Sequence, residues 1–165
     1  MAQTSYSTSQ IPRVEGARTA IIISKWYREF TESMVTKCLE VLRIAGAEIP
    51  KVHVVPGSLE IPLAAKRLVE NDPGLESIIV FGVILKGDTY HFEMVKDLAN
   101  SGLERVMCDH DIPIINEIIP VDTLEYVKAR CADDDKNKGI EAGLAAAEIM
   151  AWRRENPKRS PVDSR

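Results

Sequence analysis

The amino-acid sequence predicts an α/β fold of three layers, in which a four-stranded parallel sheet lies between two layers of helices. Short runs of β-branched apolar residues alternate with longer segments in which apolar residues recur every three or four positions. The continuous apolar run TAIIIS at 19–24 is typical of a parallel strand buried on both faces. A length of 165 residues fits one such domain.

Two strands and two helices are expected in the first half of the chain. The run TAIIIS at 19–24 predicts the first strand, and KVHVV at 51–55 predicts the second. Between them, apolar residues spaced for one helix face predict a helix over 30–45, which Gly46 ends. A second helix is expected over 61–70, after a Pro-Gly-Ser turn.

The second half continues the alternation. The run SIIVFGVIL at 77–85 is the strongest strand signal, and a helix is expected after it over 90–107. A fourth strand is expected over 113–119, because proline is tolerated at the start of a strand. Two helices follow, one over 122–130 with its first aspartate as the N-cap, and an alanine-rich one over 140–154.

No internal repeat and no shift in composition marks a second domain. We therefore expect one domain over residues 18–155. A flexible arm at 1–17 would precede it, and a frayed, proline-broken tail at 156–165 would follow it.

The composition argues against several classes of protein. With 21 Lys and Arg against 25 Asp and Glu, the net charge is −4, which argues against nucleic acid as a partner. No apolar run approaches the roughly 18 residues that a membrane helix needs, so no membrane partner is expected. Three widely spaced cysteines, interpreted as small buried side chains, fit a soluble cytoplasmic protein. The Ser/Thr-rich start leaves a cleaved organelle presequence open.

In an open parallel sheet, ligands bind beyond the carboxyl ends of the strands. That rule selects the segments 25–27, 56–60, 86–91 and 116–121. The third is the richest, because a glycine leads into a helix N-terminus whose free N–H groups suit a phosphate. His91 stands in the first turn of that helix and is a candidate for proton transfer. The alternative is a turn that only caps the helix, with His91 an ordinary surface residue.

Four further side chains have both a functional and a structural interpretation. Trp26 offers a flat wall for a planar heterocycle, or plugs the edge of the core. Glu60 accepts hydrogen bonds from ligand hydroxyls, or is a first-turn carboxylate favoured by the helix dipole. Arg130 and Lys138 hold a phosphate or a carbonyl oxygen, or are solvated charges.

Motifs for metals and cofactors fail in this sequence. Residues 133–144 begin like a calcium loop but lack the glutamate at its last position. There is no glycine-rich motif for a dinucleotide or a nucleotide phosphate, and no Gly-x-Ser-x-Gly nucleophile motif. The residues therefore predict neither a metal site nor a cofactor.

Three segments, PGSLEIPLAAKRL, GVILKGDTYHFEMV and NKGIEAGLAAAEIM, resemble in order and spacing the 6,7-dimethyl-8-ribityllumazine synthases of riboflavin biosynthesis. The resemblance covers about residues 18–152 and implies a flavodoxin-like fold. It implies a transferase that joins 5-amino-6-(D-ribitylamino)uracil to 3,4-dihydroxy-2-butanone 4-phosphate, without metal or cofactor. It also implies a homo-oligomer built from pentamers, in some members an icosahedral shell, with active sites between adjacent subunits.

The resemblance implies roles for individual residues around the butanone phosphate. His91 matches the histidine that transfers protons beside the phosphate. The turn of Gly87, Asp88 and Thr89 matches the turn that binds this substrate. Arg130 matches the arginine that pairs with the phosphate, which suits a guanidinium fork.

The resemblance also implies which residues bind ribitylaminouracil. Trp26 matches the aromatic position that stacks on the pyrimidine, and Lys138 the lysine near its carbonyl. Asn116 falls where many relatives carry a phenylalanine from the neighbouring subunit. The segment that holds the ribityl chain and the ring edge is matched by Ser58, Leu59 and Glu60.

Some positions depart from the family's usual pattern. Tyr27 occupies a position that is commonly asparagine, Tyr90 one that is small or proline, Lys86 one that is commonly arginine, and Glu117 one that is usually glycine. Tyr27 keeps a second hypothesis open, a flavin- or lumazine-binding paralogue for storage or shell assembly. A third hypothesis, a flavodoxin-like electron carrier, gains no support from the acid–base and anion-binding residues.

Overall fold

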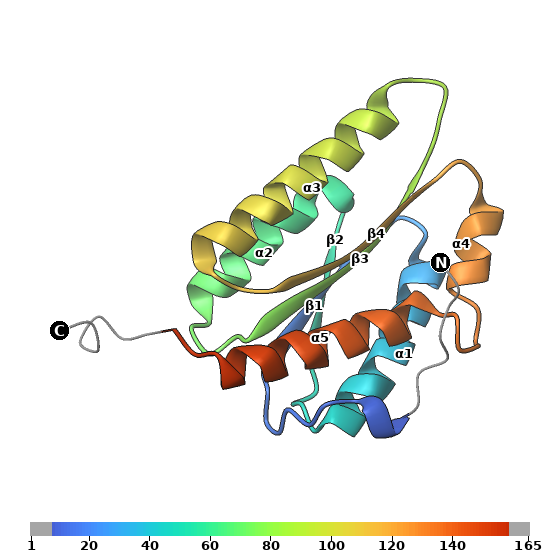
Figure 1. Cartoon of the computed structure of the whole chain (residues 1–165). Coiled ribbons are helices and arrows are strands. Elements are labelled where there is room, and N and C mark those ends of the chain that lie inside the picture. Colours follow the sequence, from blue (N-terminus) through green and yellow to red (C-terminus); the bar gives the residue numbers. More distant parts are fainter. Residues whose placement is uncertain (1–7, 159–165) are drawn as a thin grey trace.

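A computed structural model of the chain describes residues 8–158 (Figure 1). The sheet has four parallel strands in the order β2-β1-β3-β4, which confirms the predicted fold class. Its strands are β1 (Thr19–Ser24), β2 (Lys51–Val55), β3 (Ser77–Leu85) and β4 (Ile114–Val121). The helices are α1 (Arg28–Ala45), α2 (Ile61–Asn71), α3 (His91–His110), α4 (Leu124–Arg130) and α5 (Lys138–Glu155), with the short 3-10 helices η1 (Thr8–Gln10) and η2 (Ser58–Glu60).

Two long helices cover each face of the sheet. Helices α1 and α5 pack on one face and α2 and α3 on the other, while α4 follows the end of β4 (Figure 1). The central strands β1 and β3 are almost fully buried, as their β-branched runs predict. Successive side chains enter two hydrophobic clusters: Ile21 and Phe81 lie under α1 and α5, and Ile22 and Val80 under α2 and α3.

Two glycines of α5 allow its close contact with α1. A Cβ on Gly139 would overlap the backbone carbonyl of Met34. A Cβ on Gly143 would lie only 2.8 Å from the Cβ of Val41. The two helices therefore approach each other at a distance that larger side chains would prevent.

Asn137 fixes the start of α5, at Lys138 rather than at residue 140. Its buried Oδ1 accepts a hydrogen bond from the Gly139 N–H at 2.8 Å. Its Nδ2 donates to the Ala132 carbonyl at 2.8 Å and to the Ser33 hydroxyl at 3.1 Å. This amide thus ties the loop before α5 to α1 and positions Lys138 as the first residue of the helix.

Two other helix ends differ from expectation. Helix α4 begins after Thr123, which takes the N-cap position, so the prediction of Asp122 as the N-cap is wrong. Asp122 instead lies 3.7 Å from the Lys86 ammonium group. Helix α3 continues past residue 107 to His110, and Asp111 caps it in the left-handed conformation (φ 49°).

The predicted flexible arm over residues 1–17 is wrong for its second part. Val14 and Ala17 are fully buried in the cluster under α1 and α5. Val14 also donates its N–H to the last carbonyl of α1 at 2.7 Å. Residues 1–7 of the arm, and 159–165 of the predicted tail, lie outside the described residues.

The three cysteines do not share one environment. Cys38 and Cys131 are buried, as expected for small apolar side chains, and burial raises the pKa of the Cys131 thiol to about 11. Cys108 is exposed on α3, so the expectation of burial is wrong for this residue. All three are free thiols.

Candidate functional site

The carboxyl ends of β1, β2 and β3 meet at one end of the sheet, as expected for neighbouring parallel strands. They border a hollow of about 490 Å³, which we name the tryptophan hollow. Its lining includes Trp26, Ser58, Leu59, Glu60 and His91. The fold thus brings together five predicted site residues from three separate segments of the sequence.

Trp26 and Glu60 both approach Gly57 in this hollow. A Cβ on Gly57 would lie 3.1 Å from Oε2 of Glu60 and 3.7 Å from Cδ1 of Trp26. Trp26 is 70% exposed, so the alternative of a plug at the edge of the core is wrong for the single chain. An open indole face beside a carboxylate suits a planar ligand that carries hydroxyl groups.

Tyr27 also lines the tryptophan hollow and has an unusual backbone. It adopts the left-handed conformation (φ 57°, ψ 43°) immediately before α1. Few residues other than glycine take this conformation, and asparagine is among those that tolerate it best. Tyr27 therefore holds a backbone conformation that is uncommon for a large side chain.

The turn of Gly87, Asp88 and Thr89 is exposed between β3 and α3. The Thr89 Oγ1 accepts a hydrogen bond from the His91 N–H at 3.4 Å. A Cβ on Gly87 would meet no atom within 4 Å, so the backbone of the turn faces open space. This exposed turn precedes the N-terminus of α3, where free N–H groups suit an anion, and only Tyr90 separates it from His91.

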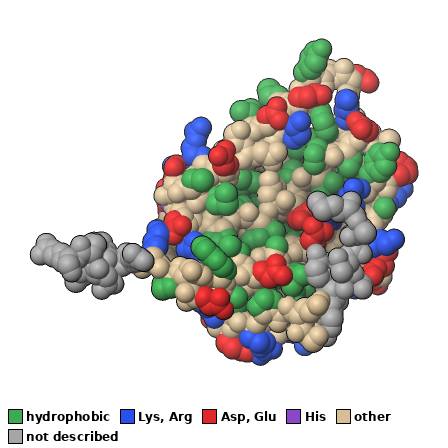
Figure 2. Space-filling model, in the orientation of Figure 1, with side chains coloured by type: hydrophobic (Ala, Val, Ile, Leu, Met, Phe, Trp, Pro, Cys, Tyr) green, Lys and Arg blue, Asp and Glu red, His purple; other side chains and the backbone are tan. Residues whose placement is uncertain are grey.

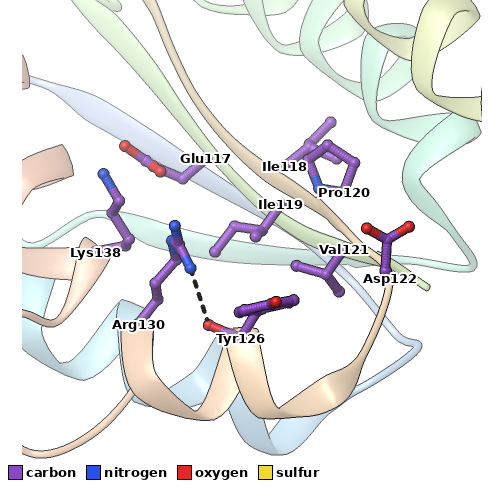
Figure 3. A pocket seen from close by; sticks show the side chains of 9 residues that line it. All are labelled: Glu117, Ile118, Ile119, Pro120, Val121, Asp122, Tyr126, Arg130 and Lys138. Carbon is purple, nitrogen blue, oxygen red and sulfur yellow. Dashed lines mark hydrogen bonds between the residues drawn. The ribbon is translucent and has the colours of Figure 1, made fainter. Parts of the chain in front are cut away.

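A second hollow of about 450 Å³ lies beside β4, and we name it the arginine hollow (Figure 3). Arg130 at the end of α4 and Lys138 at the start of α5 line it. Nη1 of Arg130 donates a hydrogen bond to the Tyr126 carbonyl at 3.2 Å, and Nζ of Lys138 lies 2.6 Å from Oε2 of Glu141. Within one chain, these two cations are therefore not in the same hollow as His91.

Glu117 of β4 faces the arginine hollow beside the ends of Lys138 and Arg130 (Figure 3). Burial raises the pKa of its carboxyl to about 7, although both cations act in the opposite direction. The sequence pattern marks Glu117 only as a departure from the family and assigns it no role. The signal present in the sequence is one acidic residue inside the apolar strand IINEIIPV.

Asn116 points away from both hollows. Because side chains alternate along a strand, it lies on the face of β4 opposite to Glu117. Its Nδ2 donates to Oδ1 of Asn100 on α3 at 2.9 Å, and its Oδ1 accepts the Ile118 N–H at 3.0 Å. The fold of the single chain thus does not bring Asn116 to the other residues assigned to ribitylaminouracil.

The fold and its two hollows define an α/β protein that binds small molecules at its strand ends. One hollow combines an indole, a carboxylate and a histidine, and the other presents a guanidinium and an ammonium group to an anion. Within the described range 8–158, no group of three or more His, Cys, Asp or Glu side chains is placed to hold a metal ion.

Comparison with known proteins shows the family. The family model of 6,7-dimethyl-8-ribityllumazine synthase matches residues 16–154. Synthases of that name from Laribacter hongkongensis and Stenotrophomonas maltophilia are 34% and 37% identical, covering 82% of this chain and 85% and 88% of the relatives. One from Saccharopolyspora erythraea is 32% identical over 89% of this chain and 88% of its own length. The chain belongs to the 6,7-dimethyl-8-ribityllumazine synthase family.

Proposed function

We propose that this protein is a lumazine synthase of riboflavin biosynthesis. It condenses 5-amino-6-(D-ribitylamino)uracil with 3,4-dihydroxy-2-butanone 4-phosphate to 6,7-dimethyl-8-ribityllumazine, and it releases phosphate and water. The observation that carries this proposal is the family match over residues 16–154. The meeting of five expected site residues in the tryptophan hollow supports it.

The tryptophan hollow has the chemistry to hold ribitylaminouracil. The exposed ring of Trp26 stacks on the pyrimidine, and the carboxylate of Glu60 accepts hydrogen bonds from the ribityl hydroxyls. Ser58 and Leu59 complete the wall from the same 3-10 helix, η2. His91 lines the same hollow, and we assign the reacting amine of the uracil to its side.

The butanone phosphate is assigned to the exposed turn of Gly87, Asp88 and Thr89 and to Arg130. The turn offers backbone N–H groups at a helix N-terminus, and Arg130 offers a planar fork of donors. Because Arg130 and Lys138 lie in the arginine hollow, one chain alone does not present all these groups to one ligand. We propose that the arginine hollow of one subunit completes the tryptophan hollow of the next.

The proposed assembly is a homo-oligomer built from pentamers. The face that carries α3, β4 and α5 shows many hydrophobic side chains at the surface (Figure 2). On α3, Met94 and Leu98 are 48% and 53% exposed. Exposed apolar residues on one helix fit a contact between subunits. In such an assembly, Asn116 would face a site built mainly by a neighbouring subunit.

The reaction needs positioning and proton transfer. The amine of the uracil attacks the ketone, and an imine forms with loss of one water. Phosphate then leaves, and the ring closes with loss of a second water. Holding the amine against the ketone contributes up to roughly 7–11 kcal/mol in favourable cases. We propose that His91 carries protons between the reacting atoms, which contributes about 10²–10⁴-fold in rate.

The proposed location is the cytoplasm. Three free cysteines fit a reducing compartment. Among the described residues, no helix has both the length and the apolar character to cross a membrane.

The deciding experiment mixes the purified protein with both substrates and follows lumazine formation by absorbance. We expect a rate well above a blank without protein, and no product when the butanone phosphate is left out. A rate equal to the blank, with tight binding of riboflavin, would contradict the proposal and would indicate a binding paralogue. The variants Trp26→Ala and Trp152→Ala form a matched pair, because both rings are exposed but only Trp26 lines the hollow.

A further inference from the structure

Glu117 is an acidic side chain in the arginine hollow that the proposed reaction does not use. It pairs in register with Phe81 of β3, and its neighbours Ile115 and Ile119 on the same face pack against the hydrophobic core. The carboxyl therefore occupies a position that the strand pattern otherwise gives to an apolar residue. It lines the arginine hollow beside the ends of Lys138 and Arg130 (Figure 3).

The charges around Glu117 come from the two elements that follow β4. Arg130 of α4 and Lys138 of α5 favour its ionised form, while Glu141 of α5 opposes ionisation. The negative charge of Glu117 also contributes to the raised pKa of the Cys131 thiol. Burial outweighs the two cations, and the carboxyl titrates near neutral pH.

The two cations are not equally committed to partners within the chain. Lys138 forms an ion pair with Glu141 at 2.6 Å. Arg130 has no ion pair with any carboxylate of residues 8–158, and its Nη1 donates to the Tyr126 carbonyl. Arg130 is thus the main positive charge in the hollow that is left for an external anion or for Glu117.

The protonation state of Glu117 decides what this hollow accepts. An ionised Glu117 offsets the charge of Arg130 and repels a dianion placed beside it. A protonated Glu117 removes that repulsion and adds an O–H donor, which suits a phosphate oxygen. A dianion in the hollow raises the proton affinity of Glu117 further, because a second negative charge disfavours ionisation.

We propose that Glu117 couples anion binding in the arginine hollow to the uptake of a proton, so that this hollow takes a phosphate-type dianion together with a proton on Glu117. The inference rests on the proposed function, because it deepens the role of Arg130 as the phosphate partner. Glu117 is in this sense a residue that sets the pH range of phosphate recognition.

Inorganic sulfate is the probe that separates this linkage from the titration of phosphate itself, since sulfate remains a dianion between about pH 5 and 9. Sulfate affinity of the whole oligomer is measured by calorimetry at constant ionic strength at several pH values. With a carboxyl that titrates at about pH 7, affinity is expected to fall by about tenfold between about pH 6 and pH 8. Titrations in two buffers of different ionisation enthalpy are expected to show proton uptake.

Glu117→Gln is the matched variant, because it keeps the size of the side chain and removes its titration. Its sulfate affinity is expected to lose that tenfold dependence on pH. Asp122→Asn removes another carboxylate from the lining of the hollow and is expected to keep that dependence. Because His91 of a neighbouring subunit also faces the proposed site, the comparison is repeated in a His91→Gln background, where the difference made by Glu117→Gln is expected to persist.

If the sulfate affinities of the unchanged protein and of Glu117→Gln depend on pH in the same way, the inference is overturned. It is also overturned by sulfate binding that Arg130→Gln leaves unchanged, because the anion would then lie elsewhere. The lumazine assay distinguishes a failure of the proposed function from a failure of the Glu117 inference. Proton-linked sulfate binding without lumazine formation would refute the proposed function only, and lumazine formation with the same pH dependence of sulfate affinity in both proteins would refute the Glu117 inference only.

Discussion

Gly82 on β3 lies directly against Ser58 on the 3-10 helix η2: a Cβ at Gly82 would come within 2.8 Å of the Ser58 hydroxyl oxygen. The same Cβ would lie 3.4 Å from the hydroxyl of Ser24 at the end of β1. A residue without a side chain in the almost fully buried strand β3 therefore allows η2 to rest on the sheet. The position of the wall that we assign to the ribityl chain depends on this contact.

Gly82→Ala is expected to displace Ser58 and with it η2. If this displacement weakens the binding free energy of ribitylaminouracil by about 1 kcal/mol, the KM for this substrate rises roughly fivefold. The KM for the butanone phosphate is expected to change little. The double variant Gly82→Ala with Ser58→Ala removes the clash, and it is expected to be more stable than Gly82→Ala alone. An unchanged KM in Gly82→Ala would contradict the assignment of η2 to this substrate.

His91→Ala is expected to keep measurable turnover, because the site contributes mainly by positioning the two substrates. The loss in kcat is expected to be about 10²–10⁴-fold, the range for general acid–base catalysis. Stopped assays with a blank lacking protein measure the residual rate. A variant that binds both ligands but shows no rate above that blank would contradict the positioning mechanism.

Arg130→Ala is expected to raise the KM for the butanone phosphate roughly 10- to 100-fold, with a smaller effect on kcat. The reason is the loss of charge-assisted hydrogen bonds to the phosphate. Lys128→Ala, which removes an exposed charge from the same helix, is the control and is expected to leave the KM unchanged. Equal effects of the two substitutions would indicate general attraction by helix α4 rather than a specific contact.

Gly139→Ala is expected to push α5 away from α1, since the new methyl group would overlap the Met34 carbonyl. Overpacking of this kind typically costs about 1–3 kcal/mol, and more where backbone must move. Thermal unfolding of Gly139→Ala against Glu148→Ala, an exposed substitution on the same helix, measures the effect. A Tm equal to that of the control would contradict the close contact between the two helices.

The stability of the chain is expected to carry a pH dependence from Glu117. The folded chain holds this proton up to about pH 7, whereas a carboxyl of ordinary pKa, 4.5, releases it earlier in the unfolded chain. Between these pH values the folded state binds more protons, so the contribution of Glu117 to the free energy of unfolding falls as the pH rises.

Chemical denaturation of the unchanged protein and of Glu117→Gln at pH 4.5 and pH 8 tests this sign. The glutamine variant is expected to gain stability relative to the unchanged protein at the higher pH. A constant difference at the two pH values would show that burial does not hold the proton on Glu117.

Much of the fold was predictable because local periodicity encodes it. The four strands, five helices and parallel sheet follow from apolar runs and helical spacing, and their confirmed order places the strand ends together. The helix ends were less predictable, because several depend on remote contacts. Asn137 caps α5 by accepting the Gly139 N–H, and its side chain is held in place by a hydrogen bond to Ser33 on α1, a remote contact that the local sequence does not indicate.

The segment before β1, which the sequence predicts as a flexible arm, also depends on remote contacts. The segment before β1 has no strand or helix periodicity, so the sequence favours an open chain there. Val14 and Ala17 are nevertheless buried, because α1 and α5 leave an apolar surface beside them that only the assembled fold creates. Whether a residue outside the helices and strands is buried depends on which elements pack around it in the folded chain.

By itself, the sequence determined the alternation of strands and helices, the strand ends where ligands bind, and the motifs that place the chain in its family. Only the tertiary structure decided that His91 and Arg130 occupy different hollows of one chain, and that Glu117 lies beside Arg130 and Lys138. The physical reason is that periodicity reports which face of an element is apolar. Distances between side chains on different elements, and the burial that shifts a carboxyl's pKa, arise only when β4, α4 and α5 pack together.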